Sequence, residues 1–102
     1  MKPKYSQKQL AFYQLLHTED WQAPHDFMGE KMIDGEWYFG GYKITARLSN
    51  LFLENPKLLV REYYTGRSGA EYYRYRIAPQ QDLFDSLESR IKDKSLLEML
   101  KI

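Results

Sequence analysis

The chain has 102 residues, of which 43% are hydrophobic and 28% are charged. This length supports one modest hydrophobic core, and the composition excludes wholesale disorder, a collagen-like repeat and a long coiled coil. There is no cysteine, which excludes disulfides and thiolate chemistry. No apolar run approaches the roughly 20 residues of a membrane span, and the opening MKPKYSQKQ lacks the apolar stretch of a secretory signal, so we expect a soluble, cytoplasmic protein.

Charge is nearly balanced over the whole chain but not along it. The net charge is +1, from 15 Lys and Arg and 14 Asp and Glu. Residues 43–76 carry seven basic and three acidic side chains, whereas residues 1–42 carry four and six, and residues 77–102 carry four and five. Five of the nine tyrosines also fall between Tyr63 and Tyr75. A local cationic excess of this kind is typical of nucleic-acid-binding surfaces.

A first helix is predicted over about residues 6–17. Ser6 and Gln9 have the spacing of a capping box, in which the serine hydroxyl accepts from the glutamine backbone while the glutamine side chain reaches back. The residues from Leu10 to Leu16 are largely apolar, and the polar run that begins at His17 ends the helix.

The next part of the chain carries weaker signals. Residues 21–23 are expected to be extended, and Pro24 favours a helical turn over about residues 24–28 because proline suits the first position of a helix. Four glycines between residues 29 and 41 predict turns around a short extended segment near residues 36–39.

The segment YKITARLSNLFLEN, residues 42–55, has the most regular helical pattern in the chain. Its apolar residues follow the i, i+4, i+7, i+8 spacing of one buried stripe, formed by Ile44, Leu48, Leu51 and Phe52. Asn55-Pro56 ends the helix, because a residue before proline is disfavoured in the α region. We therefore expect an amphipathic helix with a polar outer face.

Two runs rich in β-forming residues follow, LLVREYYTG and AEYYRYRIA. Gly66 and Gly69 between them can supply positive φ, so we predict a β-hairpin over about residues 58–78. Because side chains alternate along a strand, the second run has two different faces. The apolar face, which we expect to join the core, carries Tyr73, Tyr75 and Ile77, and the cationic, aromatic face carries Tyr72, Arg74 and Arg76.

Helical spacing resumes after Pro79. Residues 80–102 form either one long helix or two pieces split near residues 92–95, because the capping-box pattern recurs from Ser95 to Glu98. The apolar stripe of this segment either folds back on the same domain or pairs two copies of the chain, and the sequence leaves both open. A homodimer would form through Leu83, Leu87, Ile91 and Leu97.

The stretch YKITARLSNLFLENPKLLVREYYTGRSGAEYYRYRIA joins a leucine-rich helix to a strand, a glycine-bearing tip and a Tyr-Arg-Tyr-Arg-Ile return strand. With the elements that precede it, this order resembles the winged helix-turn-helix family of DNA-binding domains, most closely the small winged-helix proteins of bacteria and their phages. The resemblance implies an α+β fold, a three-helix core with a C-terminal β-hairpin wing over residues 1–79, extended by a helical segment over residues 80–102. One departure is the long stretch before the third helix, where a simple helix-turn-helix has a short turn.

The resemblance also implies how the domain would meet double-stranded DNA: the third helix enters the major groove, and the hairpin lies along the backbone or in the minor groove. The helix residues implied as contacts are Tyr42, Lys43, Thr45, Ala46, Arg47, Ser49 and Asn50, and those of the wing are Arg61, Arg67, Arg74 and Arg76. Arg47 lies at the edge of the buried stripe, where it either contacts DNA or anchors the helix. The implied function is that of a non-enzymatic transcription regulator or phage accessory protein.

Two alternatives remain open. A protein-interaction adaptor would use Leu53 and the C-terminal apolar stripe as its surface. The hairpin tyrosines could instead stack on the bases of a single nucleic-acid strand. A continuous positive band along helix and wing would favour DNA, and its interruption by Glu54, Glu62 and Glu71 would favour the adaptor.

The sequence does not indicate an enzyme. His17 and His25 are the only histidines, and they lack the paired helical spacing of a metal site such as HExxH. There is no glycine-rich phosphate loop and no nucleophile elbow. We therefore expect neither a metal nor a cofactor.

Overall fold

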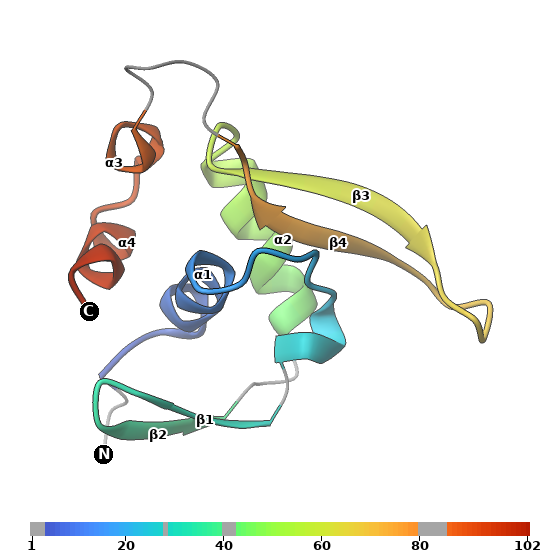
Figure 1. The fold of residues 1–102 in the computed structure, drawn as a ribbon, viewed down its shortest axis with the longest axis horizontal. Coiled ribbons are helices and arrows are strands. Elements are labelled where there is room, and N and C mark those ends of the chain that lie inside the picture. The colour runs from blue at the N-terminus through green and yellow to red at the C-terminus, as the bar shows by residue number, and fades with distance from the viewer. Residues whose placement is uncertain (1–3, 28, 40–42, 80–85) are drawn as a thin grey trace.

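The computed structural model describes residues 4–27, 29–39, 43–79 and 86–102, with the side chains of residues 31 and 37–39 left out. Its fold class is α+β, as predicted (Figure 1). The strands form two separate antiparallel hairpins. In chain order the elements are α1 (Gln7–Leu16), the 3-10 turn η1 (Pro24–Phe27), β1 (Glu30–Ile33), β2 (Glu36–Phe39), α2 (Ile44–Glu54), β3 (Leu59–Thr65), β4 (Glu71–Ile77), α3 (Leu87–Arg90), α4 (Lys94–Leu97) and the 3-10 turn η2 (Glu98–Lys101).

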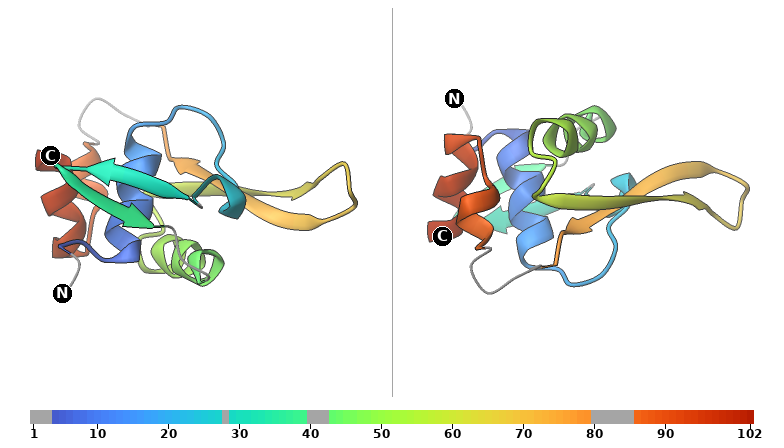
Figure 2. Two further views of the ribbon diagram at one scale, coloured as in Figure 1. Left: turned by 90° about the horizontal axis from the view of Figure 1, so that it is seen from below. Right: turned by 90° about the horizontal axis from the view of Figure 1, so that it is seen from above.

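Helix α1 lies at the centre of the molecule and begins where the sequence predicts. The Ser6 hydroxyl accepts from the Gln9 amide at 3.2 Å, and the Gln9 side chain accepts from the Ser6 amide at 2.9 Å, which completes the capping box. Ala11, Phe12 and Leu15 are buried. In both views of Figure 2, α1 lies between the C-terminal helices and the projecting hairpin β3–β4.

Helix α2 packs beside α1 through the predicted stripe. Ile44, Leu48 and Leu51 are all buried in the hydrophobic core. Removing three such side chains from water contributes about 5 kcal/mol before the cost of ordering them is subtracted. The helix ends at Glu54, because Asn55 precedes Pro56 and leaves the α region with a φ of −132°.

Strands β3 and β4 form the predicted hairpin, which projects away from the helices (Figure 1). At its tip Gly69 has a φ of +84°, a conformation that glycine adopts without strain. At its base Gln22 and Tyr75 form an antiparallel bridge, in which each backbone N–H donates to the other carbonyl at 2.8 Å. This bridge attaches the connection between α1 and η1 to β4.

The face of the hairpin next to α2 is covered only at its base. Arg61 lies opposite Tyr75 and Tyr63 lies opposite Tyr73, so these four side chains share one face. Tyr75 is 2% exposed, with its ring against Phe52 of α2, whereas Tyr73 is 41% exposed. The prediction that Tyr73 joins the core is therefore wrong, because Tyr73 lies beyond the part of the face that α2 covers.

Residues 29–39 hold a complete hairpin, although the sequence analysis predicts only one extended segment there. β1 pairs with β2 through the two-residue turn Asp34-Gly35, whose φ angles are +52° and +78°. Aspartate and glycine favour such a turn because both tolerate the left-handed region. Ile33 is buried in the core, and Asp34 accepts a hydrogen bond from Tyr5 at 2.9 Å, so the hairpin is fixed near the start of α1.

The C-terminal segment folds back on the same chain and is broken at residues 91–93, so it is not one long helix. Leu96 and Met99 are buried in the common core with α1. Hydrogen bonds add to this attachment: Gln9 Nε2 to the Ser95 carbonyl (2.8 Å), Arg90 Nη1 to the Ala78 carbonyl (2.6 Å) and the Lys92 amide to Asn55 Oδ1 (3.1 Å). Residues 86–102 are therefore part of the same packed unit.

This packing occupies most of the surface that the homodimer alternative needs. Ile91 is buried, and Leu87 and Leu97 pack half-buried against the core. Leu83 lies outside the described residues. A dimer through this stripe would first have to detach the stripe from the core, and it stays a prediction.

Asn55 should be a large polar contributor to stability. Its side chain is fully buried, donates to the Leu51 carbonyl at 3.2 Å and accepts from Lys92. We expect Asn55→Ala to lower the free energy of unfolding by about 1–3 kcal/mol, because it leaves buried partners unsatisfied. Urea denaturation would measure this, with Asn50→Ala on the exposed side of the same helix as the control, expected within about 0.5 kcal/mol of the wild type. Equal effects of the two substitutions would contradict this role.

Acidification should weaken the attachment of the C-terminal segment through Asp93. The Ser95 hydroxyl donates to its carboxylate at 2.8 Å and Lys8 lies 3.1 Å away, so the pKa of Asp93 is below its ordinary value. A depressed pKa contributes stability that is present above about pH 4 and is lost as the pH falls through the folded-state value. The free energy of unfolding of the wild type should therefore fall more between about pH 6 and pH 3 than that of Asp93→Asn. Parallel pH profiles of the two proteins would rule this out.

Candidate nucleic-acid interface

The outward face of α2 is polar, and its one acid is Glu54 at the last position of the helix. Because Ile44, Leu48 and Leu51 turn toward the core, the residues between them point away from it. No acidic residue occurs from Lys43 to Leu53. The exposed predicted contacts are Lys43, Thr45, Ala46, Arg47 and Asn50, Ser49 is half-buried, and Tyr42 lies outside the described residues.

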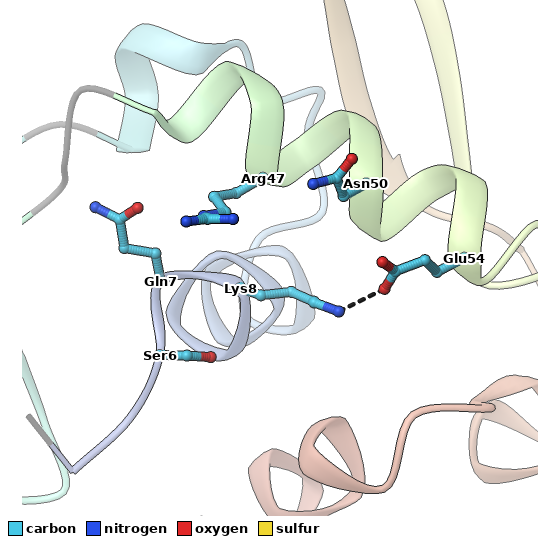
Figure 3. A pocket seen from close by; sticks show the side chains of 6 residues that line it. All are labelled: Ser6, Gln7, Lys8, Arg47, Asn50 and Glu54. Atoms are coloured by element: carbon cyan, nitrogen blue, oxygen red, sulfur yellow. Dashed lines mark hydrogen bonds and ion pairs between the residues drawn. The ribbon is translucent and has the colours of Figure 1, made fainter.

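A polar groove separates this face from the first turn of α1. It has a volume of about 410 Å³ and is lined by Ser6, Gln7, Lys8, Arg47, Asn50 and Glu54. Figure 3 shows Arg47 and Asn50 projecting from α2 toward the turn of α1 that carries Gln7 and Lys8. Arg47 is exposed, and both of its predicted roles, DNA contact and anchoring of the helix to its neighbours, stay predictions. A guanidinium and two amides around one hollow can donate several hydrogen bonds to an anionic oxygen.

The one acid of this groove is already paired. Lys8 forms an ion pair with Glu54 and a second one with Asp93 of the C-terminal segment. These carboxylates raise the pKa of Lys8 above its ordinary value, the hydrogen bond to Glu54 being the larger cause. Arg47 has no carboxylate within ion-pair distance in the part of the chain that the structure describes. The free positive charge of the groove is therefore that of Arg47.

Arg61 joins α2 to the hairpin. Its guanidinium carbon lies 4.3 Å from the centre of the Phe52 ring on α2 and 4.2 Å from that of Tyr73 on β4. Cation–π contacts of this kind hold the guanidinium in place without neutralising it. Among the described residues Arg61 has no acidic partner. The flank of α2 that carries Phe52 and one face of the hairpin thus meet at a positive charge.

Arg74 and Arg76 lie on the opposite face of the hairpin from Arg61, as strand alternation requires. Both guanidinium groups pack over Trp21, at 5.6 and 4.9 Å from its ring centre. Arg74 also stacks on Tyr64 at 4.1 Å and forms an ion pair with Glu62. The structure therefore does not bring these two arginines together with α2, and the positive side chains do not form one band from helix to return strand.

The other charged side chains of the hairpin are Arg67, Glu62 and Glu71. Arg67 is exposed at the tip of the hairpin, and no partner is described for it. Glu71 accepts a hydrogen bond from the Tyr63 hydroxyl at 2.6 Å, and Glu62 is held by Arg74. With Glu54 held by Lys8, each of the three acids of residues 43–76 has a partner within the chain. Glu54 and Glu62 are paired with cations, whereas Glu71 keeps its negative charge beside the neutral phenol of Tyr63.

Sequence analysis missed the residues that α1 contributes to the groove. Gln7 and Lys8 stand beside Arg47 only because α1 and α2 pack side by side. The capping box identifies the start of α1, but nothing local says which helix its first turn will face. Lys8 therefore has no distinguishing signal in the sequence.

The two histidines pack against aromatic rings. His17 lies 4.3 Å from Tyr13 between ring centres, and His25 meets the edge of Tyr72 at 5.7 Å. Within the described residues no group of three or more metal-ligating side chains is positioned to hold a metal ion.

None of the helices described is both long enough and apolar enough to cross a membrane. No protein-family model, curated protein or solved structure matches this chain.

The packing of Arg74 on Trp21 and Tyr64 should stabilise the hairpin. We expect Arg74→Ala to lower the free energy of unfolding by about 1 kcal/mol, because it removes two aromatic contacts and the ion pair with Glu62. Arg67→Ala removes the same charge from the exposed tip and should change stability by less than about 0.5 kcal/mol. Thermal or urea denaturation of both variants would measure the difference. An effect of Arg74→Ala no larger than that of Arg67→Ala would contradict this role.

Proposed function

We propose that this chain is a non-enzymatic, double-stranded DNA-binding protein of winged-helix type, a small cytoplasmic transcription regulator or phage accessory protein. The observation that carries it is the contact of Phe52, Arg61 and Tyr73. Through this contact the flank of α2 that carries Phe52 lies against one face of the hairpin, and we infer that the polar outward face of α2 and this face of the hairpin are open to the same duplex. A duplex lying against both would meet Arg61 where they join.

The dimensions of α2 suit a major groove. Its 11 residues are about 16 Å long, and a groove about 12 Å wide admits one helix. Asn50, Ser49 and Thr45 carry groups that hydrogen-bond base edges, since an asparagine can pair with adenine through two bonds. We assign two side chains to phosphate oxygens: Arg47, which lines the groove between α1 and α2, and Lys43, which is exposed at the start of α2.

The hairpin contributes a narrower set of contacts than the resemblance alone implies. Arg61 lies on the hairpin face next to α2, and Arg67 lies at the tip, beyond that face. We assign both to the phosphate backbone or the minor groove of the DNA. Arg74 and Arg76 are held by Trp21 on the other face, where we give them the role of supporting the hairpin.

The adaptor alternative has less surface available to it. Of the apolar residues on which it depends, Leu53 is 63% exposed, but Ile91 and Leu96 are buried, and Leu87, Leu97 and Leu100 pack half-buried against the core. A single exposed leucine is ordinary for a protein surface.

Electrophoretic mobility shift with a mixed-sequence duplex, repeated over a range of salt concentrations, would test the proposed function. We expect a complex that weakens steeply as salt rises, with a slope of about −0.9 in the log–log plot for each phosphate neutralised. Arg47→Ala should weaken binding to all sequences by about 3- to 10-fold and reduce the slope by about one, because it removes a phosphate contact. Asn50→Ala should instead change which sequence is preferred.

The matched control is Lys94→Ala, which removes one exposed positive charge from α4, on the side of α1 away from the hairpin (Figure 2). Its affinity should stay within about two-fold of the wild type. Absence of a complex with any duplex at low salt would refute the proposed function, and equal losses in Arg47→Ala and Lys94→Ala would refute the placement of the site.

A further inference from the structure

Tyr63 and Tyr73 form an exposed aromatic pair on the projecting part of the hairpin. They face each other across the two strands, with ring centres 5.3 Å apart and ring planes at 70°. Tyr63 is 58% exposed and Tyr73 is 41% exposed, which is unusual for large side chains beside a core. Tyr63 lies four residues along β3 from Leu59, about 13 Å beyond the buried base of the hairpin.

The neighbouring tyrosine pair, on the opposite face of the hairpin, is packed against other side chains of the fold. Tyr64 and Tyr72 also face each other across the strands at 5.3 Å, but both are half-buried. Tyr64 stacks on Arg74, and Tyr72 meets the edge of His25. The hairpin thus carries two tyrosine pairs with the same ring separation, of which only one is covered by the chain itself.

The chemistry around the exposed pair favours an anionic, aromatic ligand. Arg61 stacks on Tyr73 from the side of α2, and Arg67 lies at the tip beyond both rings. The one acid on this face of the two strands, Glu71, accepts a hydrogen bond from the Tyr63 hydroxyl at 2.6 Å, and this hydrogen bond raises the pKa of Tyr63 above its ordinary value. The phenol therefore stays neutral, and the two arginines outweigh the single carboxylate.

We propose that the face formed by Arg61, Tyr63 and Tyr73 binds unpaired nucleobases, so that the preferred ligand of this protein is a duplex with an adjoining single strand. An unpaired nucleotide offers a flat base to the exposed rings and a phosphate to Arg61 or Arg67. An apolar protein surface would cover the same rings but leave Arg61 desolvated without an anion. This site presupposes the proposed contact of α2 with the duplex, which would place the single strand along the hairpin.

Fluorescence anisotropy at fixed salt, with three labelled DNAs, would test this site. The DNAs are a blunt duplex of about two helical turns, the same duplex with a tail of about 8 unpaired thymidines, and the tail alone. We expect the wild type to bind the tailed duplex about ten-fold more tightly than the blunt one, the factor that one stacked base supplies.

Two double variants distinguish binding by the exposed tyrosine pair from a general effect on folding. Tyr63→Thr with Tyr73→Thr should abolish the preference for the tail, measured as the ratio of the affinities for the tailed and the blunt duplex in the same variant, so that any weaker duplex contact of Arg61 cancels; threonine keeps the strand propensity. Tyr64→Thr with Tyr72→Thr, the covered pair, should keep the preference. Tyr63→Phe retains the ring and loses only the hydrogen bond to Glu71, so it should also keep the preference. Loss of the preference in this variant would contradict stacking on the ring, even if the double variants are unstable.

The outcomes distinguish this site from the proposed function. Equal binding of blunt and tailed duplexes by the wild type would overturn the tyrosine site and leave the duplex contact intact, and so would a preference lost equally in both double variants. Equal affinity for the tail alone and for the tailed duplex, with no binding of the blunt duplex and with loss of binding in the Tyr63–Tyr73 variant, would refute the proposed function and support the tyrosine site. No binding to any of the three DNAs would refute both.

Discussion

Two backbone hydrogen bonds between Gln22 and Tyr75 fix where the projecting hairpin stands. They lie where β4 leaves the core, so the strand is held by main chain just before its side chains become exposed. Side chains then determine what lies on each face: Phe52 of α2 packs on the side of Tyr75, and Trp21 packs under Arg74 and Arg76 on the other. The bridge acts together with the contacts of Phe52 with Tyr75 and Arg61, which keep this face of the hairpin next to α2.

Local signals were sufficient for most of the secondary structure. The capping box gave the start of α1, the apolar stripe from Ile44 gave α2, and alternation in AEYYRYRIA gave the two faces of β4. How far a face of the hairpin is buried depends on tertiary packing and does not follow from the local sequence. Tyr73 and Tyr75 have the same pattern in the sequence, and only the position of α2 along the hairpin makes one exposed and the other buried.

The candidate site shows the same division between local and tertiary information. The polar face of α2 follows from its period, but the partners of each charge do not. Arg61 and Arg74 both stand in aromatic strands, yet one meets Phe52 and the other meets Glu62, because they point to opposite sides. The hairpin β1–β2 is a different case: its Asp34-Gly35 turn was a readable signal among the glycines, and the sequence analysis overlooked it.

Lys8 serves two carboxylates that belong to different parts of the fold, Glu54 at the end of α2 and Asp93 in the C-terminal segment. An anion that entered the groove and drew this ammonium toward itself would compete with both. Occupancy of the groove and docking of the last seventeen residues are therefore thermodynamically linked, and each must report on the other.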